Sequence, residues 1–261
     1  TVSGCVGKGQ QALEQELAIQ APLSYTAGVV RRALDRMHIS LEGQILLGAP
    51  PTDGLLLSKE YAKPVSQLIA DTLKDSDNLY ADSLFLHAAH ILNGSPVDWE
   101  KAQLLVKSFL QNQTGIDLTQ AVLVDGSGLS RLDRLTPAQT VGLLQFLYQK
   151  FPVTYEYIAA LPVSGRDGTL ASRLKLPAQQ DFIRAKTGTM TGINSLSGYL
   201  YTKNGHVLVF TIFSNRRPHV NPRVSGRVMI DALCNYFLAQ EPGTLSWANF
   251  FAAHKRLSFQ H

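Results

Sequence analysis

The chain has 261 residues, of which 45% are hydrophobic and 17% are charged, and its mean hydropathy is -0.01. These values are typical of a globular protein with room for one full core and part of a second domain. The sequence contains no apolar run of the roughly 18 residues that a membrane span requires. The net charge of +4 comes from scattered basic residues, which argues against a nucleic-acid-binding surface.

The N-terminal stretch differs in character from the rest. The chain starts at Thr1 and its first ten residues do not resemble the start of a domain, so we expect a piece of a longer protein. Apolar side chains at helical spacing predict a helix over residues 25–37, and residues 43–47 are typical of a short strand. The Gly- and Pro-rich segment 48–54 predicts a boundary between residues 1–50 and residues 51–261.

Helical patterns dominate the next hundred residues. They predict helices over residues 63–73, 79–92, 99–113 and 137–148. The last of these has Thr136 as its N-cap and Pro137 at its first helical position. A polar Asp-Ser-Asp-Asn interruption, residues 75–78, separates the first two helices.

The spacing of apolar residues then changes to that of strands. Residues 182–189, 195–202 and 206–214 predict three strands, with Asn204 and Gly205 forming a hairpin turn between the last two. A final helix is predicted over residues 225–238. Helices first, an antiparallel sheet later and a closing helix indicate an α+β domain.

A Lys-Thr-Gly triplet, Lys186 to Gly188, stands near the end of the first predicted strand. An ammonium group beside a hydroxyl on a strand edge can bind a substrate carboxylate, and the glycine allows close approach of a substrate backbone. A lone lysine on a strand is more often an ordinary solvated side chain. The triplet gains weight from a second motif upstream.

That second motif is Ser-Asp-Asn, Ser76 to Asn78, between two predicted helices. Residues of these types usually form a helix-capping turn, so the motif alone is weak. A Ser-Asp-Asn motif followed along the chain by Lys-Thr-Gly is, however, the order found in serine β-lactamases and penicillin-binding proteins.

Four segments together carry a more specific resemblance. They are DSDNLYADSLF (75–85), DGSGLSR (125–131), LPVSGRDGTL (161–170) and AKTGTMTGINSLSGYL (185–200). With them the chain resembles the class C low-molecular-mass penicillin-binding proteins, the D-alanyl-D-alanine carboxypeptidases/endopeptidases of the bacterial periplasm. The resemblance implies a serine β-lactamase/transpeptidase-like fold, an antiparallel sheet flanked by helices, incomplete here at its N-terminal side. Residues 1–50 would be the end of an inserted accessory domain and linker, and residues 51–261 the C-terminal part of the catalytic domain.

The resemblance also implies catalytic roles for three residues. Ser76 would help to pass a proton to the departing D-Ala amine. Asn78 would hydrogen-bond the substrate amide or the catalytic lysine of the family. Lys186 would supply positive potential.

Four further residues are implied in substrate binding. The hydroxyls of Thr187 and Thr189 would bind the terminal carboxylate beside Gly188, and the Thr189 backbone N–H would be the second oxyanion donor, a contribution of roughly 3 kcal/mol in other acyl-transfer enzymes. Arg131 resembles the family arginine that binds the free carboxylate of the diaminopimelate side chain. A structural salt bridge is the alternative role for this guanidinium.

The nucleophile motif Ser-x-x-Lys should precede Ser76, and residues 1–75 contain none. Ser172 and Lys175 fit the pattern but lie on the wrong side of Ser76, so we reject them. Because acylation needs an activated serine, we expect the isolated chain to be inactive, or to act only with its N-terminal half.

The resemblance implies a serine D-alanyl-D-alanine carboxypeptidase/endopeptidase that acts on peptidoglycan peptides in the periplasm through an acyl-enzyme. It implies no cofactor and no metal, and β-lactam antibiotics would be its inhibitors. Two alternatives remain open from the sequence, a β-lactamase and a catalytically inactive cell-wall-binding module.

Overall fold

The computed structural model describes residues 5, 7, 9, 19–49, 53–56, 58–215 and 225–239. The chain divides into two compact units, Thr1–Tyr61 and Ala62–His261. The first unit contains helix α1 (Pro22–Arg36), which confirms the helix predicted there. The strand predicted over residues 43–47 is wrong: these residues are exposed and pair with no strand among the described residues. A strand needs a neighbour to satisfy its backbone N–H and C=O groups, and sequence pattern alone does not supply one.

The second unit begins with helices. They are α2 (Val65–Lys74), α3 (Asn78–Asn93), α4 (Trp99–Thr114), α5 (Pro137–Gln149) and α6 (Val153–Ala160), followed by the short 3-10 turn η1 (Gly168–Leu170). The first four confirm the predicted helices, and Thr136 caps α5 through a complete capping box. Helix α6 was not predicted, because eight residues are too few to display a clear helical period.

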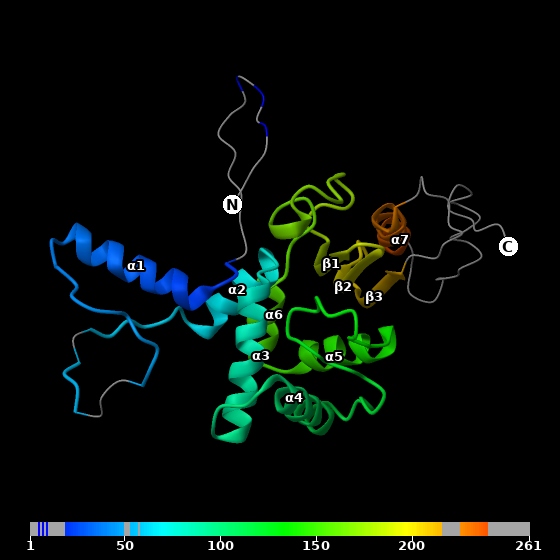
Figure 1. Ribbon diagram of the computed structural model, residues 1–261. Coiled ribbons are helices and arrows are strands. Elements are labelled where there is room, and N and C mark those ends of the chain that lie inside the picture. The colour runs from blue at the N-terminus through cyan, green and yellow to red at the C-terminus, as the bar shows by residue number, and fades with distance from the viewer. Residues whose placement is uncertain are drawn as a thin grey trace. The chain divides into compact units, whose positions relative to one another are not determined.

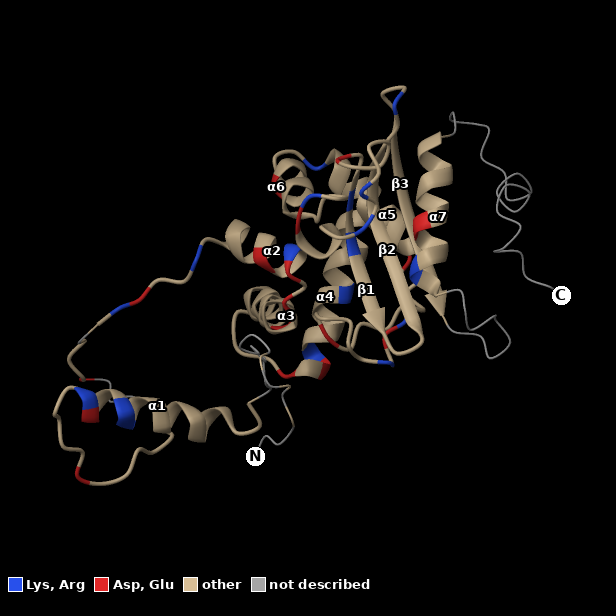
Figure 2. Ribbon diagram, turned by 90° about the horizontal axis from the view of Figure 1, so that it is seen from above, with Lys and Arg blue, Asp and Glu red and all other residues tan. Residues whose placement is uncertain are grey.

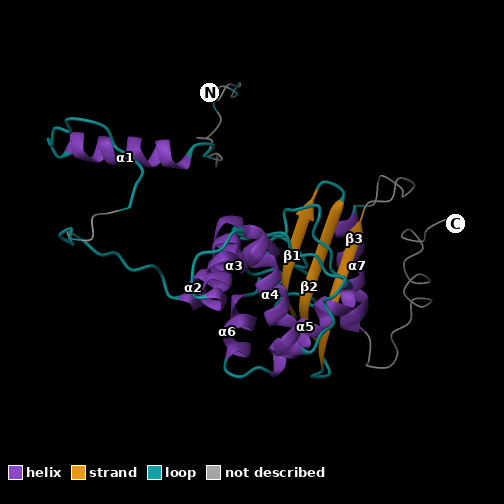
Figure 3. Ribbon diagram, turned by 60° about the horizontal axis from the view of Figure 1, so that its bottom comes forward, coloured by secondary structure: helices purple, strands orange, loops and turns teal. Residues whose placement is uncertain are grey.

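Three strands form one antiparallel sheet in the order β1-β2-β3. They are β1 (Ile183–Met190), β2 (Ile193–Tyr201) and β3 (Val207–Asn215), and they confirm the three predicted strands. The sheet lies between α7 (Gly226–Ala239) on one face and the other helices of this unit on the opposite face (Figures 1 and 3). The second unit is therefore an α+β domain, as predicted.

Both faces of the sheet are buried by apolar packing. On the α7 face, Leu196, Leu200, Ile230 and Cys234 are fully buried in one core cluster, and the Cys234 thiol is free. On the other face, the fully buried Tyr199 packs under α5 and donates a hydrogen bond of 2.7 Å to the Leu144 carbonyl. The sheet is thus held rigidly from two sides, which fixes the position of β1.

The two edges of the sheet differ. The segment 162–164 pairs with the start of β1: the Ala185 N–H donates to Pro162 O (3.0 Å) and the Ser164 N–H donates to Ile183 O (2.9 Å). Beyond Ala185, the outer edge of β1 has no backbone partner among the described residues. The outer edge of β3 likewise pairs with no described strand. Both free edges expose backbone groups that can bind another chain.

Charged residues of both signs are interspersed over the second unit (Figure 2). Within the described part of the chain, no helix combines the length and the apolar character needed to cross a bilayer.

The DGSGLSR segment packs tightly against α3. The Asp82 carboxylate accepts the backbone N–H groups of Gly126 (3.0 Å) and Ser127 (2.9 Å). A Cβ atom at Gly126 would lie 2.4 Å from the Ala81 carbonyl oxygen and 2.6 Å from the Phe85 Cβ. The segment can therefore approach the helix this closely only because residue 126 is a glycine.

We predict that Gly126→Ala lowers the free energy of unfolding by about 2–3 kcal/mol, because the new methyl group overlaps the α3 backbone. Urea denaturation followed by circular dichroism measures this change. Gly128→Ala is the matched control: Gly128 has φ +74 but nothing within 4 Å of the added Cβ, so it should cost only about 1 kcal/mol. Equal losses for the two variants would contradict the tight packing described above.

Candidate active site

Ser76 lies in the tight turn between α2 and α3. Helix α2 ends at Lys74, and Ser76 adopts a left-handed conformation with φ 60. This reverses the chain so that Asp77 can cap α3, its side chain accepting the Tyr80 N–H at 2.9 Å. The left-handed conformation costs a residue with a Cβ roughly 1–2 kcal/mol. The cap and the two packed helices hold the half-buried Ser76 in this conformation.

Lys186 of β1 meets Ser76 across the gap between the sheet and the helices. Its Nζ donates to Ser76 Oγ at 2.7 Å and to the Thr187 carbonyl at 2.9 Å. Two motifs separated by 110 residues are thereby in direct contact. Lys186 has no carboxylate partner among the described residues, and burial lowers its pKa from the ordinary 10.5. The site thus offers a desolvated cation to an anionic ligand.

The free edge of β1 supplies the backbone groups of the site. Ile183 and Ala185 direct their hydrogen-bonding groups outward to the segment 162–164. Since this direction alternates along a strand, Thr187 and Thr189 also face outward, where no described residue pairs with the strand. The Thr189 N–H is therefore available beside the Lys186 ammonium, and a carbonyl oxygen placed there could accept a hydrogen bond from it.

The packing of the sheet requires a glycine at position 188, a requirement that was not predicted from the sequence. It pairs with Ser195 of β2, and a Cβ atom at Gly188 would lie 2.3 Å from Ser195 Oγ. The Ser195 hydroxyl thus occupies the space of a side chain at this position. Thr187 also has an internal partner, because its hydroxyl donates to Thr169 Oγ1 at 2.8 Å. Thr189 has an exposed side chain.

Arg131 and Asn78 lie at the rim of this arrangement. Arg131 is exposed, and its Nη2 donates to the carbonyl of Thr191 at 3.3 Å, in the turn directly after β1. It forms no salt bridge with a described residue. Asn78 is the exposed first residue of α3, directly after the Ser76 turn. Both side chains are therefore exposed to a ligand, although Arg131 already has one backbone partner.

The rejected Ser-x-x-Lys match lies elsewhere. Ser172 and Lys175 are exposed in a region of turns, with Leu174 between them at φ 52, so they do not share a helical face. No group of three or more His, Cys, Asp or Glu side chains suited to a metal ion occurs among the residues that the structure describes.

Two acidic side chains, Asp82 and Asp125, hold the site in shape and were not among the predicted site residues. Asp82 binds the DGSGLSR segment, and within that segment the Asp125 carboxylate accepts the N–H groups of Gly128 (2.5 Å) and Ser130 (2.8 Å). Asp125 thereby closes the turn in this segment. Asp82 lies in segment 75–85, one helical turn after Asn78. That spacing places Asp82 on the same face of α3 as Asn78, and it was the feature of the sequence that could have indicated its role.

Comparisons with known proteins show which family the chain belongs to. The model of the family described as "D-Ala-D-Ala carboxypeptidase 3 (S13) family" matches residues 1–233. The chain is 33% identical over 216 residues to a D-alanyl-D-alanine carboxypeptidase of Haemophilus influenzae, covering 82% of this chain and 45% of that protein. It is 31% identical over 205 residues to a D-alanyl-D-alanine carboxypeptidase of Actinomadura, covering 76% and 37%. The chain thus spans less than half the length of these curated relatives.

Solved structures agree. Penicillin-binding protein 4 of Haemophilus influenzae superposes with a TM-score of 0.76 at 30% identity, over 85% of this chain and 50% of that one. A predatory endopeptidase of Bdellovibrio bacteriovorus shares the fold, with a TM-score of 0.52 at 17% identity over 85% of this chain and 56% of that one. The chain therefore belongs to the D-Ala-D-Ala carboxypeptidase 3 (S13) family, which confirms the resemblance to the low-molecular-mass penicillin-binding proteins.

Proposed function

We propose that this chain forms the substrate-binding wall of a serine D-alanyl-D-alanine carboxypeptidase/endopeptidase and supplies its proton-relay serine. The observation that carries the proposal is the 2.7 Å hydrogen bond from Lys186 to Ser76, beside the free edge of β1. A cation, a hydroxyl and an outward-facing N–H group within one site match the needs of peptide-bond cleavage next to a terminal carboxylate.

In this mechanism the substrate lies along the free edge of β1. Its terminal carboxylate approaches the Lys186 ammonium and the exposed Thr189 hydroxyl. The Thr187 hydroxyl can join them only by exchanging its present partner, Thr169. The Thr189 N–H then donates to the carbonyl oxygen of the scissile bond, where negative charge develops during attack, while Gly188 keeps this stretch of strand free of a side chain.

Ser76 acts on the leaving group. Lys186 donates to Ser76 Oγ, so the Ser76 proton is directed away from the lysine and toward the departing amine. When the nucleophilic serine forms its ester bond to the acyl carbon, the C–N bond breaks and the D-Ala nitrogen takes that proton. The proton released by the attacking serine then replaces it on Ser76. Asn78, two residues after Ser76, orients the substrate amide. Water then hydrolyses the ester.

The attacking serine is proposed to lie on an N-terminal half of the same protein. The free outer edge of β3 and the chain's coverage of less than half of its curated relatives support this partner. Because peptidoglycan lies outside the cytoplasmic membrane, the proposed substrate places the protein in the periplasm. β-Lactams, which mimic the acyl-D-Ala-D-Ala group, would acylate the complete site.

We predict that a fluorescent penicillin does not label the isolated chain, because residues 1–75 lack Ser-x-x-Lys. Gel fluorescence should show labelling once an N-terminal half that carries this motif is co-expressed. Labelling of the isolated chain would contradict the proposal. The variant Ser172→Ala then serves as the control, since loss of that label would identify Ser172 as the nucleophile.

Binding of an N-acylated peptide ending in D-Ala-D-Ala to the isolated chain should depend on the charge of Lys186. As the pH rises through the lowered pKa of Lys186, below 10.5, the ammonium is lost and affinity should fall by about 10- to 100-fold. Lys186→Arg stays charged through this range, so its affinity for the peptide should not change with pH. Lys186→Gln has no charge at this position and should bind the peptide weakly at every pH. NMR titrations measure these affinities. Identical pH profiles for wild type and Lys186→Arg would exclude the proposed contact.

Arg131 is proposed to bind the free carboxylate of a diaminopimelate side chain. In the co-expressed enzyme, Arg131→Gln should lower kcat/KM about 10- to 100-fold for peptides with that carboxylate. For matched peptides that carry lysine instead, kcat/KM should be unchanged. Equal losses for both peptides would instead favour a structural role, through the Thr191 carbonyl.

A further inference from the structure

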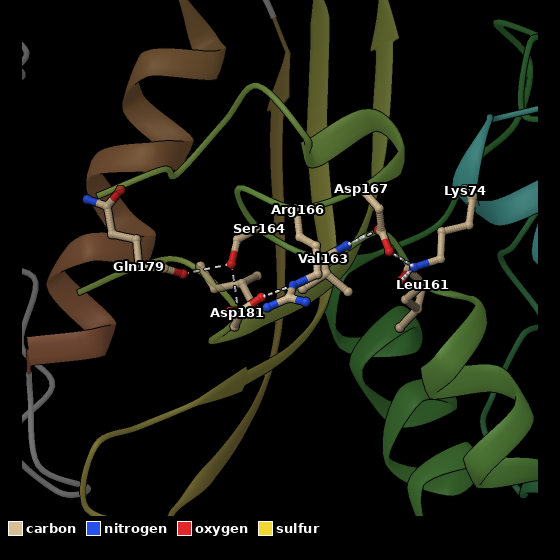
Figure 4. Close-up of polar contacts among 9 residues, drawn as sticks. Lys74, Leu161, Val163, Ser164, Arg166, Asp167, Gln179 and Asp181 are labelled. Carbon is tan, nitrogen blue, oxygen red and sulfur yellow. Dashed lines mark hydrogen bonds and ion pairs between the residues drawn. The ribbon is translucent and has the colours of Figure 1, made fainter. Parts of the chain in front are cut away.

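The loop of residues 161–170 connects the two motifs of the proposed site. On one side it is fixed to β1 by the fully buried Ser164, whose hydroxyl donates to Gln179 O (2.7 Å) and accepts the Ile183 N–H (3.1 Å). On the other side it reaches the end of α2. Figure 4 shows both attachments, with Ser164 and Gln179 on one flank and Asp167 and Lys74 on the other.

The attachment to α2 is an ion pair two residues before Ser76. Lys74 Nζ lies 2.6 Å from Asp167 Oδ2 and donates to the Leu161 carbonyl at 2.7 Å. The other Asp167 oxygen accepts the Val163 N–H at 2.8 Å. The side chains of Lys74 and Asp167 are 22% and 39% exposed, so water screens this pair only in part. Both charged groups are thus tied to the loop backbone as well as to each other.

Backbone packing reinforces the ion pair. Gly168 has φ 53, and a Cβ atom there would lie 2.7 Å from the Lys74 carbonyl oxygen. The loop therefore lies directly against the last turn of α2, at a distance that only glycine permits. The next residue, Thr169, accepts the hydrogen bond from the Thr187 hydroxyl at 2.8 Å. Three consecutive residues thus touch α2 and then β1.

We infer that Asp167, Gly168 and Thr169, together with Lys74, are positioning residues that hold the Ser76 turn at a fixed distance from Lys186 and Thr187. The inference rests on the proposed function of Ser76 and Lys186. The ion pair between Asp167 and Lys74 also affects the electrostatics of the site. Asp167 neutralises Lys74, so the cations of the site without a carboxylate partner among the described residues are Lys186 and the exposed Arg131.

The first test needs no ligand. In protein labelled with ¹³C-lysine, NMR reports the pKa of Lys186, with its signal assigned through Lys186→Arg. In Asp167→Asn the end of α2 should move, Ser76 should separate from Lys186, and water should raise the pKa of Lys186 toward 10.5. The matched control is Asp181→Asn, which removes the exposed ion pair to Arg166 (2.8 Å) on the same loop without a contact to α2. This control should leave the pKa of Lys186 unchanged.

The second test measures peptide binding by the same chain. Thr169→Val removes the acceptor of the Thr187 hydroxyl while keeping the side-chain shape, and it should weaken binding of an N-acylated D-Ala-D-Ala peptide about 10-fold. Thr169→Ser should restore wild-type affinity. Tighter binding by Thr169→Val would mean that Thr169 merely competes for the Thr187 hydroxyl, and would overturn its positioning role.

The two tests separate the inference from the proposed function. An unchanged pKa of Lys186 in folded Asp167→Asn, with wild-type peptide affinity, would overturn the inference and leave the proposed function standing. A raised pKa in Asp167→Asn, in a chain whose wild type binds no peptide, would support the positioning role and overturn the proposed substrate. Thermal unfolding checks that each variant is folded.

Discussion

The site depends on one half-buried ammonium group, that of Lys186, which has no carboxylate partner in the part of the chain that the structure describes. Removing Lys186 from water is unfavourable, and here only hydroxyl and carbonyl oxygens, from Ser76 and Thr187, replace its hydration. A nearby Asp or Glu would stabilise the lysine but would also cancel the field that an anionic substrate needs. The unfavourable free energy of desolvating Lys186 is offset by apolar packing elsewhere, because both faces of the sheet are buried.

The sheet edge is divided into two parts with different tasks. Up to Ala185 the outer edge of β1 is satisfied by the segment 162–164, which fixes the strand in the fold. Beyond that residue no described residue pairs with this edge, and the proposed substrate would continue a pairing that the protein itself has begun. Such a division holds the substrate-binding stretch rigid, because it is the direct extension of a strand whose start is already hydrogen-bonded.

Local patterns predicted most of the fold, because the helices and strands of the second unit have clear periods and caps. The strand expected at residues 43–47 failed because pairing depends on a neighbour far along the chain. The family resemblance put Lys186 and Ser76 in one active site, but their direct contact was not predicted, since spacing alone places no two side chains together. The reason for Gly188 was incomplete, because Ser195 is brought over it by the register of β2. The role of Asp167 depends on a distant backbone and had no local signal.

The free outer edge of β3 has a consequence for how such a chain can be handled. Its sequence, VLVFTIFSN, is mostly apolar, and no described strand pairs with the backbone groups of its outer edge. A second copy could add to this edge as readily as the proposed N-terminal half, so self-association would compete with complementation. In a continuous polypeptide the proposed N-terminal half would be synthesised first and would already be present when β3 emerges from the ribosome. The order of synthesis would then prevent the β3 edge from pairing with a second copy of the chain. This protection against aggregation would be lost if the two halves were made as separate chains.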